Sequence, residues 1–169
     1  PHQSELEARI VNYELAARMQ LEASGIVDIS QETKATRKQY GLDNEVTASY
    51  GARCLLARRL IEAGVRFVQV FQPGKQPWDS HKNTKQKIGK IAPQVDLPSA
   101  ALVKDLKDRG LLEETLVIWG GEFGRLPVSQ YGKGRDHNRN AFTILLAGGG
   151  VTQGFTYGAT DDLGYRAAD

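Results

Sequence analysis

The stretch TLVIWGGEFGRLP, residues 115–127, carries the strongest structural signal in the chain. Its first five residues are β-branched or apolar, which is typical of a strand that is buried on both faces. The predicted strand stops at two glycines, and Glu122 and Arg125 follow directly. A carboxylate and a guanidinium in that position indicate a ligand, an acid–base group or the two halves of an ion pair.

Two other runs predict strands: VRFVQVF at residues 65–71, and FTILLA at residues 142–147, which leads into three glycines. Helices are predicted over residues 4–25, 44–63 and 91–109, each closed by a glycine. The first of these repeats apolar side chains at helical spacing, namely Leu6, Ile10, Tyr13, Ala17 and Leu21. Because helices alternate with strands, the sequence predicts an α/β fold with a mainly parallel sheet and flanking helices.

Composition narrows the class of protein. The 169 residues are 40% hydrophobic and 25% charged, which is typical of a single globular domain. A net charge of +2 without a run of like charges argues against nucleic acid as a partner. The apolar runs are too short for a membrane span. The single cysteine, Cys54, excludes an internal disulfide and is predicted to be a core thiol.

Three polar motifs follow the predicted strands: WDSH at 78–81, GEFGR at 121–125 and GRDHN at 134–138. Because ligands collect beyond the carboxyl ends of strands in α/β sheets, we expect these motifs to meet at one edge. Carboxylates and imidazoles together bind divalent metals, so a site for Zn²⁺, Mn²⁺, Ca²⁺ or Mg²⁺ is predicted. The candidate metal ligands are Asp79, His81, Glu122, Asp136 and His137.

Other interpretations of the same residues stay open. His81 and His137 could be ordinary solvated histidines, and Asp79 could cap a turn. Glu122 could pair with Arg125, and Asp136 with a neighbouring arginine. If a metal binds, Arg125 and Arg135 are the candidates to hold an anionic substrate.

The motifs resemble those of a bacterial family, DUF1501. WDSH is similar to the family's WDTH-type motif, GEFGRLP to its GEFGRTP-type motif, and GRDHN to its GRDHW-type motif. FTILLAGGGV and YGATDD extend the resemblance, which covers about residues 40–165. It implies a relation to sulfatases and alkaline phosphatases, and hence a partial alkaline-phosphatase-like sheet. Residues 1–169 would form one domain, the C-terminal part of a larger one, with a helical segment at 1–40.

The resemblance also implies roles for individual residues. Asp79 and His81 match the first Asp and His ligands of the superfamily, and His137 matches the last histidine. Glu122 falls where a second aspartate would be, as ligand or acid–base group. Phe123 stands where a second histidine is expected, which favours one metal or none over a two-zinc centre.

Two functions follow from this resemblance. The first is hydrolysis of phosphate or sulfate esters, with an anionic small molecule or a sulfated glycan as substrate. In this function Glu122, Arg125 and Arg135 act on the ester. The second is a non-catalytic binding or structural role on the same fold. The chain alone is expected to be inactive, because the superfamily's nucleophile precedes these motifs. An exposed sheet edge predicts homo-oligomers, and the full-length protein is expected to be exported.

Overall fold

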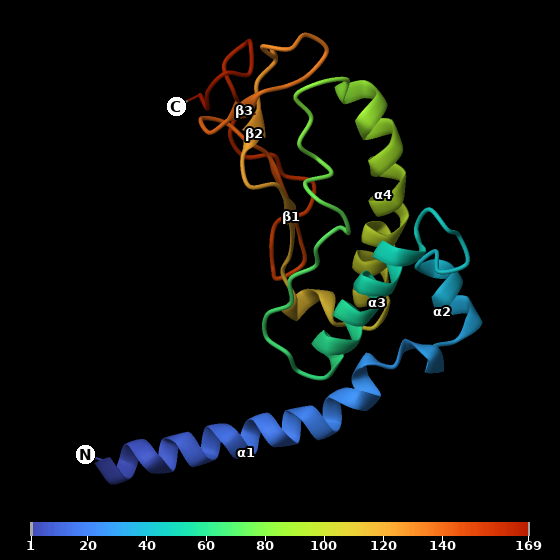
Figure 1. Cartoon of the computed structure of the whole chain (residues 1–169), viewed down its shortest axis with the longest axis vertical. Helices are drawn as coiled ribbons and strands as arrows, with labels where there is room; N and C mark the ends of the chain where they lie inside the picture. Colours follow the sequence, from blue (N-terminus) through green and yellow to red (C-terminus); the bar gives the residue numbers. More distant parts are fainter. Residues whose placement is uncertain (1, 169) are drawn as a thin grey trace.

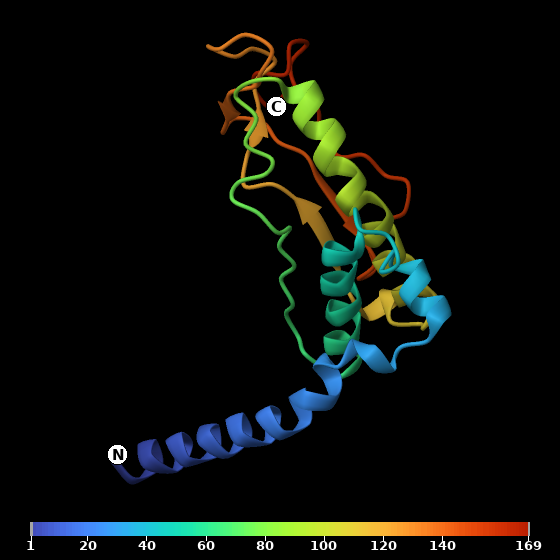
Figure 2. The same cartoon turned by 45° about the vertical axis from the view of Figure 1, so that its right-hand side comes forward.

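The computed structural model describes residues 2–168; within the first helix it describes the side chains of residues 4–14, 17 and 24–27. The elements are α1 (His2–Val27), η1 (Ile29–Gln31), α2 (Lys34–Gln39), α3 (Ala48–Glu62), α4 (Thr84–Asp108), η2 (Leu112–Glu114), β1 (Val117–Gly120), β2 (Gly124–Arg125), β3 (His137–Asn138) and β4 (Ile144–Ala147). Helices α3 and α4 lie side by side, and the strands lie beside them (Figures 1 and 2).

The core lies between α3, α4 and the residues around Tyr40. Tyr40, Cys54, Leu55, Val95 and Ala101 are all buried there. Cys54 is 1% exposed, so the prediction of a core thiol is confirmed. Burial raises the pKa of its thiol to about 12, because the thiolate would lose its hydration.

An ion-pair network joins the same helices. The Arg58 side chain is 3% exposed, and it lies 2.8 Å from Glu32 and 3.0 Å from Asp105. It also pairs with Glu62, one turn further along α3. The hydroxyl of Tyr40 donates over 2.9 Å to Asp105 Oδ2, the same oxygen that pairs with Arg58. A buried guanidinium with three carboxylates around it therefore fixes how α3 and α4 dock.

Two of the three predicted helix ends are confirmed, at Gly64 and Gly110, whereas Gly25 lies inside α1, which continues to Val27. Two of the predicted starts are also wrong. Gly64 and Gly110 have φ values of 84° and 73°, the left-handed conformation that ends a helix. Helix α3 begins at Ala48 rather than at residue 44, because residues 41–47 form turns. Helix α4 begins at Thr84 rather than 91 and runs through Pro93 and Pro98. The amide of Thr84, the first in α4, donates to the carbonyl of Lys133. The helix can therefore begin at Thr84 without leaving this amide unpaired.

The prediction of a mainly parallel, alkaline-phosphatase-like sheet is wrong. Among residues 2–168 there are two sheets, each of two antiparallel strands. β1 pairs with β4 so that Trp119 lies opposite Leu145, and β2 pairs with β3. The physical reason is the connection between β1 and β4. It is a long loop with no crossover helix, and such a loop simply returns the chain antiparallel.

The predicted strand at residues 65–71 is also wrong. This segment has no strand assignment. Val70 packs against the core, while Phe67 and Phe71 are 80% and 63% exposed. β-propensity alone did not make a strand here because no neighbouring strand pairs with this backbone. The α/β expectation thus fails at its first strand.

Helix α1 extends away from the rest of the molecule in both views (Figures 1 and 2). It confirms the helix predicted over residues 4–25, although Leu6, Ile10 and Tyr13 on its apolar side are exposed. Leu21, which was expected on the same side, lies outside the described side chains. Within the described residues, neither this helix nor any other combines the length and apolarity needed to cross a bilayer.

Candidate metal centre

The WDSH motif lies in the loop that leads into α4. Trp78 packs against the core, which anchors the residues that follow it. The carbonyl of Ser80 accepts hydrogen bonds from the amide of Arg135, at 3.0 Å, and from Thr84 Oγ1, at 2.9 Å. One carbonyl therefore ties this loop both to the start of α4 and to the GRDHN motif.

His137 reaches the same place through the small β2–β3 sheet. Arg125 lies opposite His137 in this antiparallel pair, and Gly124 lies opposite Asn138. Gly124 is required sterically, because a Cβ there would lie 1.9 Å from the carbonyl oxygen of Ala141. The glycine in GEFGR thus lets the chain approach closely enough for β2 and β3 to pair.

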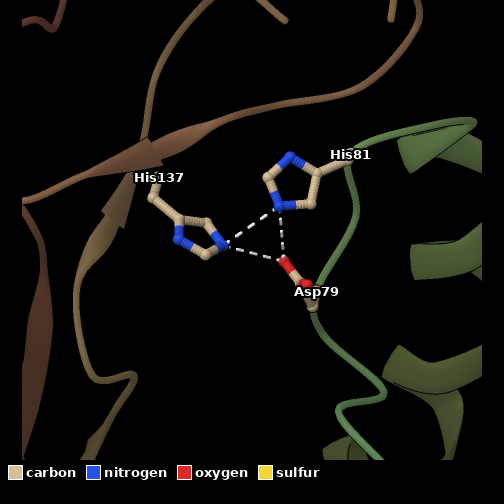
Figure 3. Close-up of side chains that lie close together, drawn as sticks. All are labelled: Asp79, His81 and His137. Carbon is tan, nitrogen blue, oxygen red and sulfur yellow. Dashed lines mark hydrogen bonds and ion pairs between the residues drawn. The ribbon is translucent and has the colours of Figure 1, made fainter.

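Three side chains converge between the loop and the sheet: Asp79, His81 and His137 (Figure 3). His81 Nε2 lies 3.1 Å from His137 Nε2 and 3.1 Å from Asp79 Oδ1. His137 Nε2 lies 3.0 Å from the same Asp79 oxygen. These three atoms form a nearly equilateral triangle, and all three side chains are at least partly exposed to solvent.

The tautomer of His81 follows from the partner of its other nitrogen. Nδ1 lies 2.8 Å from Asp136 Oδ1. The hydrogen bond from His81, followed by one from the amide of Gln130, lowers the pKa of Asp136, so its carboxylate is ionised and only accepts. His81 Nδ1 must therefore donate, and in the neutral ring Nε2 carries a lone pair. Figure 3 shows this nitrogen facing Asp79 and His137, so its lone pair lies within the triangle.

Asp79 is strongly acidic in this setting. The hydrogen bond from His137, followed by one from Arg125 over 2.7 Å, lowers the pKa of Asp79 to about 2. The triangle is therefore made of a carboxylate oxygen, the lone pair of His81 and an imidazole nitrogen of His137. In the metal-free chain the proton on His137 Nε2 lies between these atoms, and a bound metal would take its place.

The geometry fits a metal ion. Ligand atoms on one tetrahedral zinc at ordinary bond lengths lie about 3.3 Å apart, close to the observed edges. Two imidazoles and one carboxylate form a ligand set that suits Zn²⁺ or Mn²⁺, and exposure leaves a side open for water or substrate. Ca²⁺ and Mg²⁺ prefer oxygen ligands, so this set suits them less well.

The structure places the other predicted residues outside the triangle. The Glu122 side chain is 67% exposed and lies 3.9 Å from Arg125. Asp136 contacts the far nitrogen of His81. Arg135 is exposed, and its guanidinium donates to the carbonyl of Gly134. Arg125 alone of the two predicted arginines touches a member of the triangle, Asp79.

Some contacting residues were missed by the sequence reasoning. Ser129 Oγ donates to the carbonyl of His81 over 3.0 Å and lies 3.4 Å from Asp136. Lys87 donates to the carbonyl of Asp79 from the first turns of α4. The ring of Phe123 lies 4.2 Å from that of His137, between centroids. No motif signals these contacts, although the sequence position of Phe123 beside Glu122 marked it as a departure.

Comparisons with known proteins agree with the motifs. No curated protein and no solved structure matches the chain significantly. The profile of one family, described as "Protein of unknown function (DUF1501)", matches residues 1–169. The match spans the N-terminal helix as well as the three motifs that form and support the triangle. The chain therefore belongs to the DUF1501 family.

Proposed function

We propose that Asp79, His81 and His137 bind one divalent transition metal, and that this centre serves the hydrolysis of phosphate or sulfate esters. The observation that carries the proposal is the triangle of Nε2, Nε2 and Oδ1 atoms with edges of 3.0 to 3.1 Å. The resemblance of the motifs to those of sulfatases and alkaline phosphatases supports the choice of reaction.

The bound metal would stabilise negative charge on the phosphoryl or sulfuryl oxygens. The chain's own residues would hold the ester. Arg125 uses Nη1 to hold Asp79 over 2.7 Å, while its Nη2 lies 3.9 Å from Glu122. That longer contact leaves guanidinium donors for an ester oxyanion at the edge of the triangle. Glu122, which is exposed beside Arg125, would exchange a proton with substrate or water.

A non-catalytic binding protein is the second candidate, and one contact favours it. Phe123 packs on His137 at the position where the resemblance leads one to expect another histidine. An apolar ring there supplies no ligand for a second metal. A single metal that binds an anion without turning it over would fit this arrangement equally well.

Metal titration of the purified 169-residue chain tests the shared part of both functions. We expect about one zinc per chain, and we expect a large loss of affinity in Asp79→Asn, His81→Ala and His137→Ala. Glu122→Gln is the matched control, because this carboxylate lies outside the triangle. Equal zinc binding by the wild type and the three triangle variants would contradict the proposal, as would no binding at all.

Anion binding tests ester recognition, which both functions share, and turnover separates the two. Phosphate and sulfate are titrated into the zinc-loaded chain. Arg125→Ala is expected to lower the affinity for the anion that binds, whereas Arg135→Ala is expected to change that affinity little. Failure of both anions to bind zinc-loaded protein would contradict ester recognition. Turnover of an aryl phosphate or sulfate by this chain, abolished in His137→Ala, would overturn the expectation that the nucleophile belongs to another segment.

We also propose self-association through the β1–β4 sheet. Ile118, Trp119, Leu145 and Leu146 are between 46% and 62% exposed, so both faces of this sheet are apolar and open. Exposed apolar strands with free edges tend to pair with further strands. Sedimentation is expected to show oligomers that Trp119→Lys weakens, and a wild-type monomer at high concentration would contradict this proposal.

A further inference from the structure

A carboxylate outside the triangle holds one of its imidazoles from behind. His81 Nδ1 donates to Asp136 Oδ1 over 2.8 Å, on the side of the ring opposite to the nitrogen that faces His137. Among the described residues, His137 Nδ1 has no such partner. The two histidines of the triangle are therefore oriented in different ways, one by a carboxylate and one by its strand.

Asp136 is itself firmly held. Its second oxygen, Oδ2, accepts from the backbone amide of Gln130 over 2.9 Å. Ser129 Oγ lies 3.4 Å from Oδ1 and donates to the carbonyl of His81 over 3.0 Å. Both carboxylate oxygens of Asp136 thus accept hydrogen bonds from His81 or from the 129–136 segment, and neither is among the three atoms of the triangle.

The backbone of the same segment also holds His81. Gly134 packs so closely that a Cβ there would lie 1.9 Å from the carbonyl oxygen of His81. The amide of Arg135 donates to the carbonyl of Ser80, one residue earlier. The 129–136 segment therefore contacts both the main chain at residues 80–81 and the ring of His81.

We infer that Asp136 is a positioning residue, which fixes His81 in the Nδ1-protonated tautomer and leaves its Nε2 lone pair in the triangle. The inference rests on the proposed metal centre for its functional meaning, because a metal requires an unprotonated ligand nitrogen. A carboxylate behind a ligating imidazole orients the ring and raises its basicity, and its loss weakens metal binding by about 10- to 100-fold. Asp136 thus acts on the metal through His81 and not as a ligand.

The experiment has two readouts on the full 169-residue chain. The first is the tautomer of His81 in metal-free protein, measured by long-range ¹H–¹⁵N correlation at about pH 9, where an ordinary histidine is neutral. The second is zinc affinity. We expect wild-type His81 to be Nδ1-protonated, and Asp136→Ala to shift it towards the Nε2-protonated form and to weaken zinc about 10- to 100-fold.

Two further variants keep the test sharp. Asp136→Asn retains an oxygen that accepts from Nδ1, so it is expected to restore much of the wild-type tautomer and to bind zinc with intermediate affinity. Asp96→Ala, an exposed carboxylate on α4, is the matched control and is expected to match the wild type in both readouts. An Arg135 amide that keeps its hydrogen bond to the Ser80 carbonyl in Asp136→Asn, measured by amide hydrogen exchange, would show that the segment remains folded.

The outcomes distinguish this inference from the proposed function. An unchanged His81 tautomer in Asp136→Ala, or an unchanged zinc affinity despite a changed tautomer, would overturn the positioning role. If zinc binds none of the proteins while His81 still changes tautomer in Asp136→Ala, the metal centre is contradicted and the orientation of the ring by Asp136 stands.

Discussion

His81 and His137 lie 56 residues apart in the sequence, and their Nε2 atoms lie 3.1 Å apart in the structure. The rings are tilted by 45° with centroids 4.7 Å apart, so they meet nitrogen to nitrogen and not face to face. Imidazoles that stack for packing would bring their carbon faces together. This edge-on approach, with a carboxylate oxygen closing the triangle, is the arrangement that a shared cation stabilises.

The acidity of Asp79 is the first testable consequence. Its pKa is lowered from 3.8 to about 2, chiefly by the hydrogen bond from His137 and then by Arg125. A lowered carboxyl pKa stabilises the fold at pH values above 3.8, and this contribution is lost as the pH falls towards 2. In metal-free Arg125→Leu, carbon-detected NMR titration is expected to show the pKa rising towards 3.8. A pKa that stays near 2 in that variant would show that Arg125 does not contribute.

Gly134 offers a test of the close packing behind His81. In Gly134→Ala the new methyl group would lie 1.9 Å from the His81 carbonyl oxygen, so the 129–136 segment must move away. We expect a destabilisation of about 1–3 kcal/mol and a clear loss of zinc affinity, measured by urea unfolding and by metal titration. Gly121→Ala is the control, because the new methyl group would make only an ordinary 3.6 Å contact with the carbonyl oxygen of Phe123. Equal zinc affinity in both variants would contradict the proposal that packing of the 129–136 segment against His81 supports metal binding.

Arg58 tests what holds α3 and α4 together. Replacing it by methionine would remove the buried cation from Glu32 and Asp105, whose side chains are each 9% exposed, and would leave them only the more exposed Arg59 and Arg109. Loss of one partner from a buried ion pair costs about 3–5 kcal/mol, so a large fall in the free energy of unfolding is expected. Lys104→Met removes an exposed i,i+4 pair with Asp108 within α4 and is expected to cost under about 1 kcal/mol. Similar urea midpoints for the two variants would contradict the assigned role of Arg58.

Local signals in the sequence predicted the helices well. Gly64 and Gly110 adopt the left-handed conformation that ends a helix, and a glycine reaches that conformation at little cost. The start of α4 could not be read from the sequence. Thr84 begins this helix because its amide finds the carbonyl of Lys133, and that contact spans 49 residues of chain. A start that depends on a distant partner leaves no local pattern.

The sheet could not be predicted for a related reason. A strand needs a neighbour to complete its backbone hydrogen bonds, and the composition of residues 65–71 cannot reveal whether one is present. All three residues of the triangle were nonetheless among the predicted metal ligands. The sequence predicted that they meet at the shared edge of a parallel sheet, and the structure brings them together in another way. Pairing of β2 with β3 and the bond from Arg135 to Ser80 bring His137 to the WDSH loop instead.

The role of Asp136 shows the limit of spacing arguments at the site itself. The sequence predicts both Asp136 and His137 as candidate ligands, because the side chains of adjacent residues outside a known strand can point either way. In the structure His137 is the first residue of β3, and Asp136 precedes the strand. Only the 2.8 Å contact with His81 Nδ1 assigns Asp136 to the far side of that ring.

Anomalous diffraction from crystals of this chain grown with zinc tests the metal centre most directly. We expect one strong peak at the zinc edge, about 2.0–2.2 Å from His81 Nε2, His137 Nε2 and an oxygen of Asp79. Asp136 is expected to remain on His81 Nδ1 in those crystals. A fully loaded crystal with its peak elsewhere, or with no peak between these three side chains, would contradict the account.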